Sequence, residues 1–111
     1  MGTTSSLGEF EQVVVLAILR LGDAAYGVTI STEITACTGR EPTSGALYAT
    51  LDRLEDKGLI SSRLGEPTRQ RGGRAKRYYT VNARGRAAIT RAQQSYRRLL
   101  DGCKLPGLTY A

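Results

Sequence analysis

The side chains of this sequence that could do chemistry are mostly basic, and they are gathered in one segment. Between residues 63 and 91 there are nine lysines and arginines and a single acidic residue, Glu66, so this segment has a net charge of +8. The rest of the chain has seven basic and nine acidic residues, a net charge of −2, and the total is +6. A cationic segment on a nearly neutral protein is typical of a site that binds a polyanion.

The other reactive side chains are too few for catalysis or metal binding. The chain has no histidine, which excludes histidine-dependent triads and histidine zinc sites. Two cysteines, Cys37 and Cys103, are too few for a structural zinc site or a disulfide framework, which favours a reducing, cytoplasmic setting. An enzyme with a cysteine nucleophile is the alternative, but no imidazole is present to activate a thiol. We therefore expect no enzyme activity, no catalytic residues, no cofactor and no metal.

One amphipathic helix is the element around which the rest of the chain is organised. Leu47, Leu51 and Leu54 are spaced four and three residues apart, so they lie on one face of a helix with 3.6 residues per turn. Thr43 can cap the beginning of this helix, and Gly58 can adopt the left-handed conformation that ends many helices. A strand is expected directly after it.

The opposite face of this helix suits a groove lined with phosphates. Its N-terminal part is small or carries hydroxyl groups, and the dipole and free N–H groups of a helix favour anions there. Its C-terminal part is acidic. An ordinary surface helix with one buried face is the alternative interpretation. The outward residues that we expect at the phosphate-lined groove are Thr43, Ser44, Gly45, Tyr48, Ala49 and Arg53.

A hairpin with a strongly basic tip is predicted after the helix. Residues 60–66 and 76–81 have the composition of two strands, and Gly72 and Gly73 can supply the positive φ of a tight turn between them. Like charges gathered on one loop are costly without a partner. A solvated loop is the alternative, because charge runs are usually solvated.

Helices are expected before and after this unit. Two are predicted at residues 9–21 and 27–38, and the longest apolar run, residues 13–19, suits a buried helix but not a membrane span. A last helix begins after Asn82 and ends near residue 101 or 104. Its first turns are expected to pack on the domain and its last turns on a second copy, through a seam with heptad spacing formed by Ile89, Ala92, Tyr96, Leu99 and Cys103.

Three helices followed by a hairpin with a basic tip are the winged-helix arrangement of the helix-turn-helix class. The predicted fold is thus mainly α with a small β-hairpin. The predicted organisation is a disordered tail (1–7), a winged-helix DNA-binding domain (8–81), a dimerisation helix (82–104) and a tail (105–111). Arg53 is expected to read a base edge, because guanidinium binds guanine bidentately. The basic residues of the wing, on phosphates or in the minor groove, are Arg69, Arg71, Arg74 and Lys76.

The run GALYATLDRLEDKGLI, followed by GGRAKRYYTVNARGRAAI, resembles the PadR family of bacterial transcriptional regulators. The resemblance extends over about residues 7–100 and is to the compact members with a single C-terminal helix. It implies a DNA-binding winged helix, a homodimer formed mainly through the C-terminal helix, and repression relieved by a small ligand. Carried over by position, it implies DNA contacts from Thr43, Ser44, Gly45 and Tyr48 and a wing that includes Arg74, Lys76 and Arg77.

Two further expectations concern an effector and an alternative function. Without a separate ligand domain, an effector could bind only between the winged helix and the dimer helices, near Phe10, Tyr26 and Tyr96. The alternative function is a winged helix that binds RNA or a protein without recognising an operator, because residues 71–74 read Arg-Gly-Gly-Arg and resemble an RNA-binding element.

Overall fold

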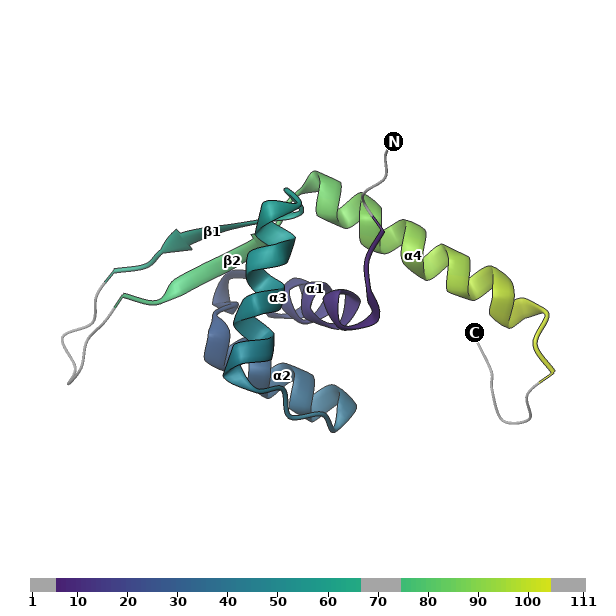
Figure 1. Cartoon of the computed structure of the whole chain (residues 1–111), viewed down its shortest axis with the longest axis horizontal. Coiled ribbons are helices and arrows are strands. Elements are labelled where there is room, and N and C mark those ends of the chain that lie inside the picture. Colours follow the sequence, from purple (N-terminus) through teal and green to yellow (C-terminus); the bar gives the residue numbers. More distant parts are fainter. Residues whose placement is uncertain (1–5, 67–74, 105–111) are drawn as a thin grey trace.

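The computed structural model describes residues 6–66 and 75–104 of the chain. The described part is mainly helical, with one two-stranded antiparallel sheet, which confirms the predicted winged-helix fold (Figure 1). The elements in order are α1 (Glu9–Leu21), a short 3₁₀ turn (Gly22–Ala24), α2 (Gly27–Thr38), α3 (Ser44–Asp56), β1 (Ile60–Leu64), β2 (Arg77–Val81) and α4 (Ala83–Asp101).

The helices begin and end where local sequence signals predict. The side chain of Thr43 accepts a hydrogen bond from the backbone N–H of Ala46 (3.1 Å) at the start of α3. The left-handed glycines that follow α2 and α3 are Gly39 (φ +78°) and Gly58 (φ +76°). Asn82 caps α4, because its Oδ1 accepts from the N–H of Gly85 (2.9 Å). Such caps satisfy backbone groups that the helix itself leaves unpaired.

The two strands of the hairpin are shorter than the sequence predicted. Its strands pair from Ile60 opposite Val81 to Leu64 opposite Arg77, and one more hydrogen bond joins the N–H of Gly65 to the carbonyl of Lys76 (2.7 Å). Strand pairing therefore ends near residue 65 instead of residue 66. The predicted tip, residues 67–74, lies outside the described residues.

The core is organised around α1. Its buried side chains include Val14, Val15 and Ile18, and they pack with Leu51 and Leu54 of α3. Further apolar side chains from α2, both strands and the start of α4 complete this core; they include Ile30, Ile34, Leu59, Ile60, Tyr79, Val81, Ala88 and Ile89. Among the described residues, every buried side-chain nitrogen and oxygen has a hydrogen-bond partner.

The prediction that the disordered N-terminal tail extends to residue 7 is wrong. Leu7 is buried in the core, with 9% of its surface exposed. Its carbonyl accepts a hydrogen bond from the side chain of Gln12 (3.2 Å). An apolar residue just before a helix commonly packs against the first turns of that helix, which fixes how the chain enters it. Residues 1–5 and 105–111 lie outside the described part.

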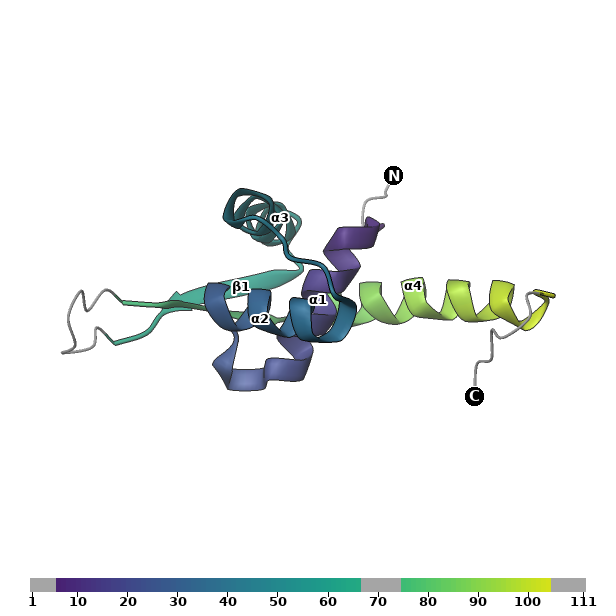
Figure 2. The ribbon, with the colours of Figure 1, turned by 90° about the horizontal axis from the view of Figure 1, so that it is seen from below.

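The hairpin and α4 extend to opposite sides of the helical body, and α3 lies along one outer surface (Figures 1 and 2). The start of α4 is anchored tightly, because a Cβ added to Gly85 would lie 2.2 Å from the carbonyl oxygen of Leu59. Within the described residues, no helix has the length and apolar character needed to cross a bilayer.

Candidate nucleic-acid interface

The outward face of α3 is the one that helical periodicity predicted. Leu47, Leu51 and Leu54 are buried, with exposures between 0% and 3%. The residues on the opposite side, which include most of the contact residues expected from this helix, are exposed; they are Ser44, Gly45, Tyr48, Ala49, Asp52 and Arg53. The small side chains near the N-terminal end of this face leave the helix backbone accessible to a large partner.

Tyr48 lies at the corner between α2 and α3. Its side chain is 46% exposed, and its hydroxyl lies against the backbone of Gly27, where an added Cβ would be only 1.9 Å from the hydroxyl oxygen. A groove of about 220 Å³ beside it is lined by Gly27, Val28, Ser31, Thr32, Pro42, Ser44, Leu47 and Tyr48. Ser31 and Thr32 were not among the expected contacts, because their proximity to α3 is a tertiary feature.

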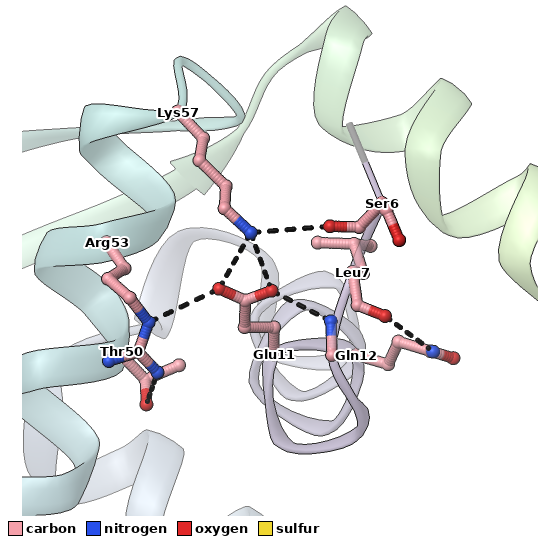
Figure 3. Close-up of polar contacts among 8 residues, drawn as sticks. Ser6, Leu7, Glu11, Gln12, Thr50, Arg53 and Lys57 are labelled. Carbon is pink, nitrogen blue, oxygen red and sulfur yellow. Dashed lines mark hydrogen bonds and ion pairs between the residues drawn. The ribbon is translucent and has the colours of Figure 1, made fainter. Parts of the chain in front are cut away.

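Arg53 is anchored within the protein on one side and open to solvent on the other (Figure 3). Its Nε donates to Oε2 of Glu11 over 3.4 Å, and its Nη2 donates to the hydroxyl oxygen of Thr50 over 3.1 Å. Its side chain nevertheless remains 56% exposed. Arg53 thus lies on the outward face of α3 with two partners. Thr50 is one turn earlier on the same helix, whereas Glu11 is 42 positions away and its proximity is not indicated by the sequence.

Glu11 is the centre of a cluster that joins the beginning of α1 to the end of α3 (Figure 3). Its side chain is only 7% exposed, and it accepts hydrogen bonds from Nζ of Lys57 (2.8 and 3.0 Å) and from the N–H of Gly8 (2.8 Å). Burial alone would raise the pKa of Glu11, but hydrogen bonds from Lys57, Gly8 and Arg53 outweigh it, so the pKa lies below its ordinary value. Glu11 and Lys57 were not expected near the site, because no local pattern in the sequence marks their contact.

A second polar contact joins α3 to the hairpin. The hydroxyl of Ser62 on β1 donates to Oε2 of Glu55 on α3 (2.8 Å), and Nη1 of Arg77 on β2 donates to the Ser62 oxygen (3.0 Å). Arg77, an expected DNA contact, therefore also connects the two strands to α3. This contact fixes the middle of the hairpin relative to α3.

The outer end of the described strands carries two cations held over tyrosine rings. Tyr26, at the start of α2, packs edge-on against Tyr78 of β2, with 5.4 Å between ring centroids. Lys76 lies 4.6 Å from the centroid of Tyr26, and Arg63 lies 4.9 Å from that of Tyr78. Arg63 was not among the expected contacts. It lies directly opposite Tyr78 in the strand register, which brings its side chain to the Tyr78 ring. The expected contacts Arg69, Arg71 and Arg74 lie outside the described residues.

The predicted seam of α4 divides into two parts. Ile89 is buried in the core, with 5% exposure, and Ala92 is half-buried. Tyr96 and Leu99 are 49% and 71% exposed, and Cys103 is exposed as well. The first turn of the seam thus belongs to the domain, and the later turns present apolar side chains to solvent.

The three aromatic residues expected near an effector have separate surroundings in the single chain. Tyr26 contacts Tyr78. The guanidinium carbon of Arg40 lies over the ring of Phe10, 5.0 Å from the ring centroid. Tyr96 is on the projecting part of α4. In the described part of the chain, none of these contacts joins two of the three side chains. No cluster of three or more possible metal ligands occurs in the described part of the chain.

Comparisons with known proteins agree with this geometry. The model of the transcriptional regulator PadR-like family matches residues 15–91. Similar solved structures include a transcriptional regulator from Clostridium thermocellum, with 24% identity, a TM-score of 0.69 and coverage of 82% of this chain and 85% of that one. A PadR family transcription regulator from Clostridium difficile R20291 has 24% identity, a TM-score of 0.67 and coverage of 83% and 92%.

A third similar structure, the protein smu.1704 from Streptococcus mutans UA159, has 25% identity, a TM-score of 0.63 and coverage of 91% of this chain and 92% of that one. No curated protein matches the chain. The family match confirms the resemblance that the sequence motifs indicated, and the structural matches support the same fold.

Proposed function

This chain belongs to the PadR-like family of transcriptional regulators, and from that premise we propose that it binds a DNA operator as a homodimer and represses transcription. The observation that carries the proposal is the exposed outward face of α3, a helix that hydrogen bonds of Ser62 with Glu55 and Arg77 join to the cationic hairpin. In winged-helix proteins such a helix enters the major groove while the hairpin lies on the neighbouring backbone.

The residues at the start of α3 suit close contact with the duplex. Gly45 and Ala49 have little side chain, so the helix backbone can approach the groove. The hydroxyls of Thr43, Ser44 and Tyr48 are suited to phosphate oxygens, which the positive end of a helix dipole also favours. Specificity is assigned to Arg53, because bidentate contacts from arginine to guanine discriminate among base pairs.

The hairpin supplies most of the non-specific attraction. Lys76 and Arg77 lie at the outer end of its described strands, together with Arg63, and we assign Arg69, Arg71 and Arg74 to its tip. Basic side chains on phosphates release counterions, so affinity falls steeply as salt increases. We assign these residues to backbone contacts that position α3 and carry little sequence information.

Dimerisation is assigned to the later turns of α4. Tyr96 and Leu99 expose apolar surface on a helix that projects from the domain, and a second copy can cover it through a two-fold contact. The proposed interface also includes Ala92 and Cys103, whereas Ile89 contributes to the core of its own chain. Two domains related by a two-fold axis read two half-sites of an operator.

Relief of repression by a small ligand is part of the proposal. Since Phe10, Tyr26 and Tyr96 have separate surroundings within one chain, an effector site requires the second copy, with Tyr96 at the interface as its centre. Thermal-shift screening of the dimer tests this step. A compound that stabilises the wild type but not a Tyr96→Ala variant is expected, and stabilisation that is the same in both would place the site elsewhere.

The proposal as a whole is tested by fluorescence anisotropy on duplex DNA from upstream of the protein's own gene. A scrambled duplex and a single-stranded RNA of equal length serve as controls, and the titrations are repeated over a series of salt concentrations. We expect selective binding of the upstream duplex, with two subunits per site. Preference for the RNA would favour the alternative function, and equal binding to both duplexes would contradict operator recognition.

A further inference from the structure

Glu11 is the most deeply buried carboxylate near the proposed interface, and its partners are unequal. Its contacts with Lys57 and Gly8 are 2.8 to 3.0 Å long, whereas its contact with Arg53 is 3.4 Å long. A buried carboxylate is costly unless it is paired and hydrogen-bonded. Lys57 and Gly8 satisfy that requirement on their own, so the contact with Arg53 is not needed to keep Glu11 buried.

The contact with Arg53 restrains the arginine more than it stabilises the carboxylate. Arg53 is held at two points, by Glu11 and by the hydroxyl of Thr50, while 56% of its side chain faces solvent. A free arginine side chain loses substantial rotamer entropy when it binds, and a pre-organised one loses less. An unrestrained arginine would also reach neighbouring phosphates, which are present at every DNA sequence.

We propose that Glu11 is a positioning residue that holds Arg53 toward the base edges and thereby sets the sequence preference of α3. This inference rests on the proposed DNA-binding function and adds a residue of α1 that does not itself touch DNA. The contacts with Glu11 and Thr50 use Nε and Nη2 of Arg53 and not Nη1, so the arginine can reach a base while both residues still hold it.

The Glu11→Gln variant removes this restraint with little change in shape. The amide oxygen can still accept from Gly8 and Lys57, but the amide NH₂ group cannot accept from Nε of Arg53. Thr50→Val removes the other anchor of Arg53 and keeps the volume of a residue that is 2% exposed. The matched control is Glu9→Gln, the same change on the same helix, at an exposed carboxylate that pairs with Arg40 over 3.0 Å.

The readout is discrimination, the ratio of the Kd for a scrambled duplex to the Kd for a selected one. We expect Glu11→Gln and Thr50→Val each to lower this ratio by about fivefold or more, at the low end of what one base contact contributes. Glu9→Gln should leave it unchanged. In an Arg53→Ala background, Glu11→Gln should have no further effect, because the two residues act through one contact. Unchanged discrimination in Glu11→Gln, or independent effects in the double variant, would overturn the proposal.

A second measurement separates this inference from the proposed function. If the wild type shows no selectivity among duplexes, operator recognition fails, and the positioning claim is then tested without DNA. Nitrogen-15 relaxation of the Nε–H group of Arg53 should report a restrained side chain in the wild type and in Glu9→Gln. The same group should be mobile in Glu11→Gln. Equal mobility in all three proteins would show that Glu11 does not position Arg53.

Discussion

The two halves of α4 have opposite surroundings. In the first half, Gly85, Ala88 and Ile89 are buried against the hairpin and α1, and Asn82 ties the helix start to Gly58 through a hydrogen bond of 2.9 Å. In the second half, Leu99 is 71% exposed. The difference teaches that one helix serves two purposes. Its beginning closes the winged-helix body, and its end has apolar surface that the described part of the chain leaves uncovered.

The largest effect on stability is expected from replacing a leucine in the hydrophobic core, compared with replacing one at the end of α4. Leu51→Ala should lower the free energy of unfolding by about 2–5 kcal/mol, because the side chain is fully buried and its loss leaves a cavity. Leu99→Ala, measured at a concentration where the protein is monomeric, should change it by about 0.5 kcal/mol or less. Urea denaturation measures both, and equal losses would contradict the division of α4.

The second test adds a charge to each half. Tyr96→Glu should weaken the proposed dimer by about 2–5 kcal/mol, because it leaves an unpaired carboxylate in an apolar interface. Ala87→Glu, at an exposed position in the first half, is the control and should leave the dimer intact. Sedimentation equilibrium gives both dissociation constants. A dimer that survives Tyr96→Glu would move the interface to another surface.

The third test uses two glycines in helices. Gly85→Ala should destabilise the protein by about 1–3 kcal/mol, because the new methyl group would lie 2.2 Å from the Leu59 carbonyl oxygen and force the backbone apart. Gly45→Ala, with nothing within 4 Å of the added carbon, should instead stabilise α3 by up to about 1 kcal/mol. Thermal unfolding of the two variants should shift in opposite directions. A loss of stability from both changes would show that the loss in Gly85→Ala does not come from the closeness of Gly85 to Leu59.

The smallest effect concerns how the stability of the winged-helix domain changes at acidic pH. The pKa of Glu11 in the folded protein is below its ordinary value of 4.5, so the unfolded chain binds more protons as the pH falls past that value. The stabilisation from Glu11 is therefore complete above about pH 4.5 and is lost as the pH falls through the folded pKa. Glu11→Gln should have a shallower loss of stability in acid than the wild type. Identical acid profiles would mean that the cluster does not couple folding to protonation.

The sequence predicted the parts of the fold that depend on neighbouring residues. The glycines that follow α2 and α3, and the cap at Asn82, act within one turn, so the helix bounds could be inferred from them. The outward face of α3 followed from the leucine spacing. Strand ends and the burial of Leu7 could not be inferred in this way, because they depend on what the rest of the chain packs against them.

The candidate site was only partly predictable for the same reason. The contact between Glu11 and Arg53 joins residues 42 positions apart, and no local pattern marks it. Tyr48 was predicted as a contact residue, but its packing on Gly27 depends on how α2 meets α3. Arg63 was recognisable as part of the basic segment, whereas its position over Tyr78 required the strand register.

The most direct test of the central claim, operator recognition by two copies of α3, is selection from a random duplex DNA library with the wild-type protein. Such a selection identifies the bound sequence without a chosen operator as its starting point. The account predicts one enriched motif with two-fold symmetry, whose half-sites are spaced by about one helical turn or a multiple of it. A library that stays random after repeated selection, or a single motif without symmetry, would contradict it.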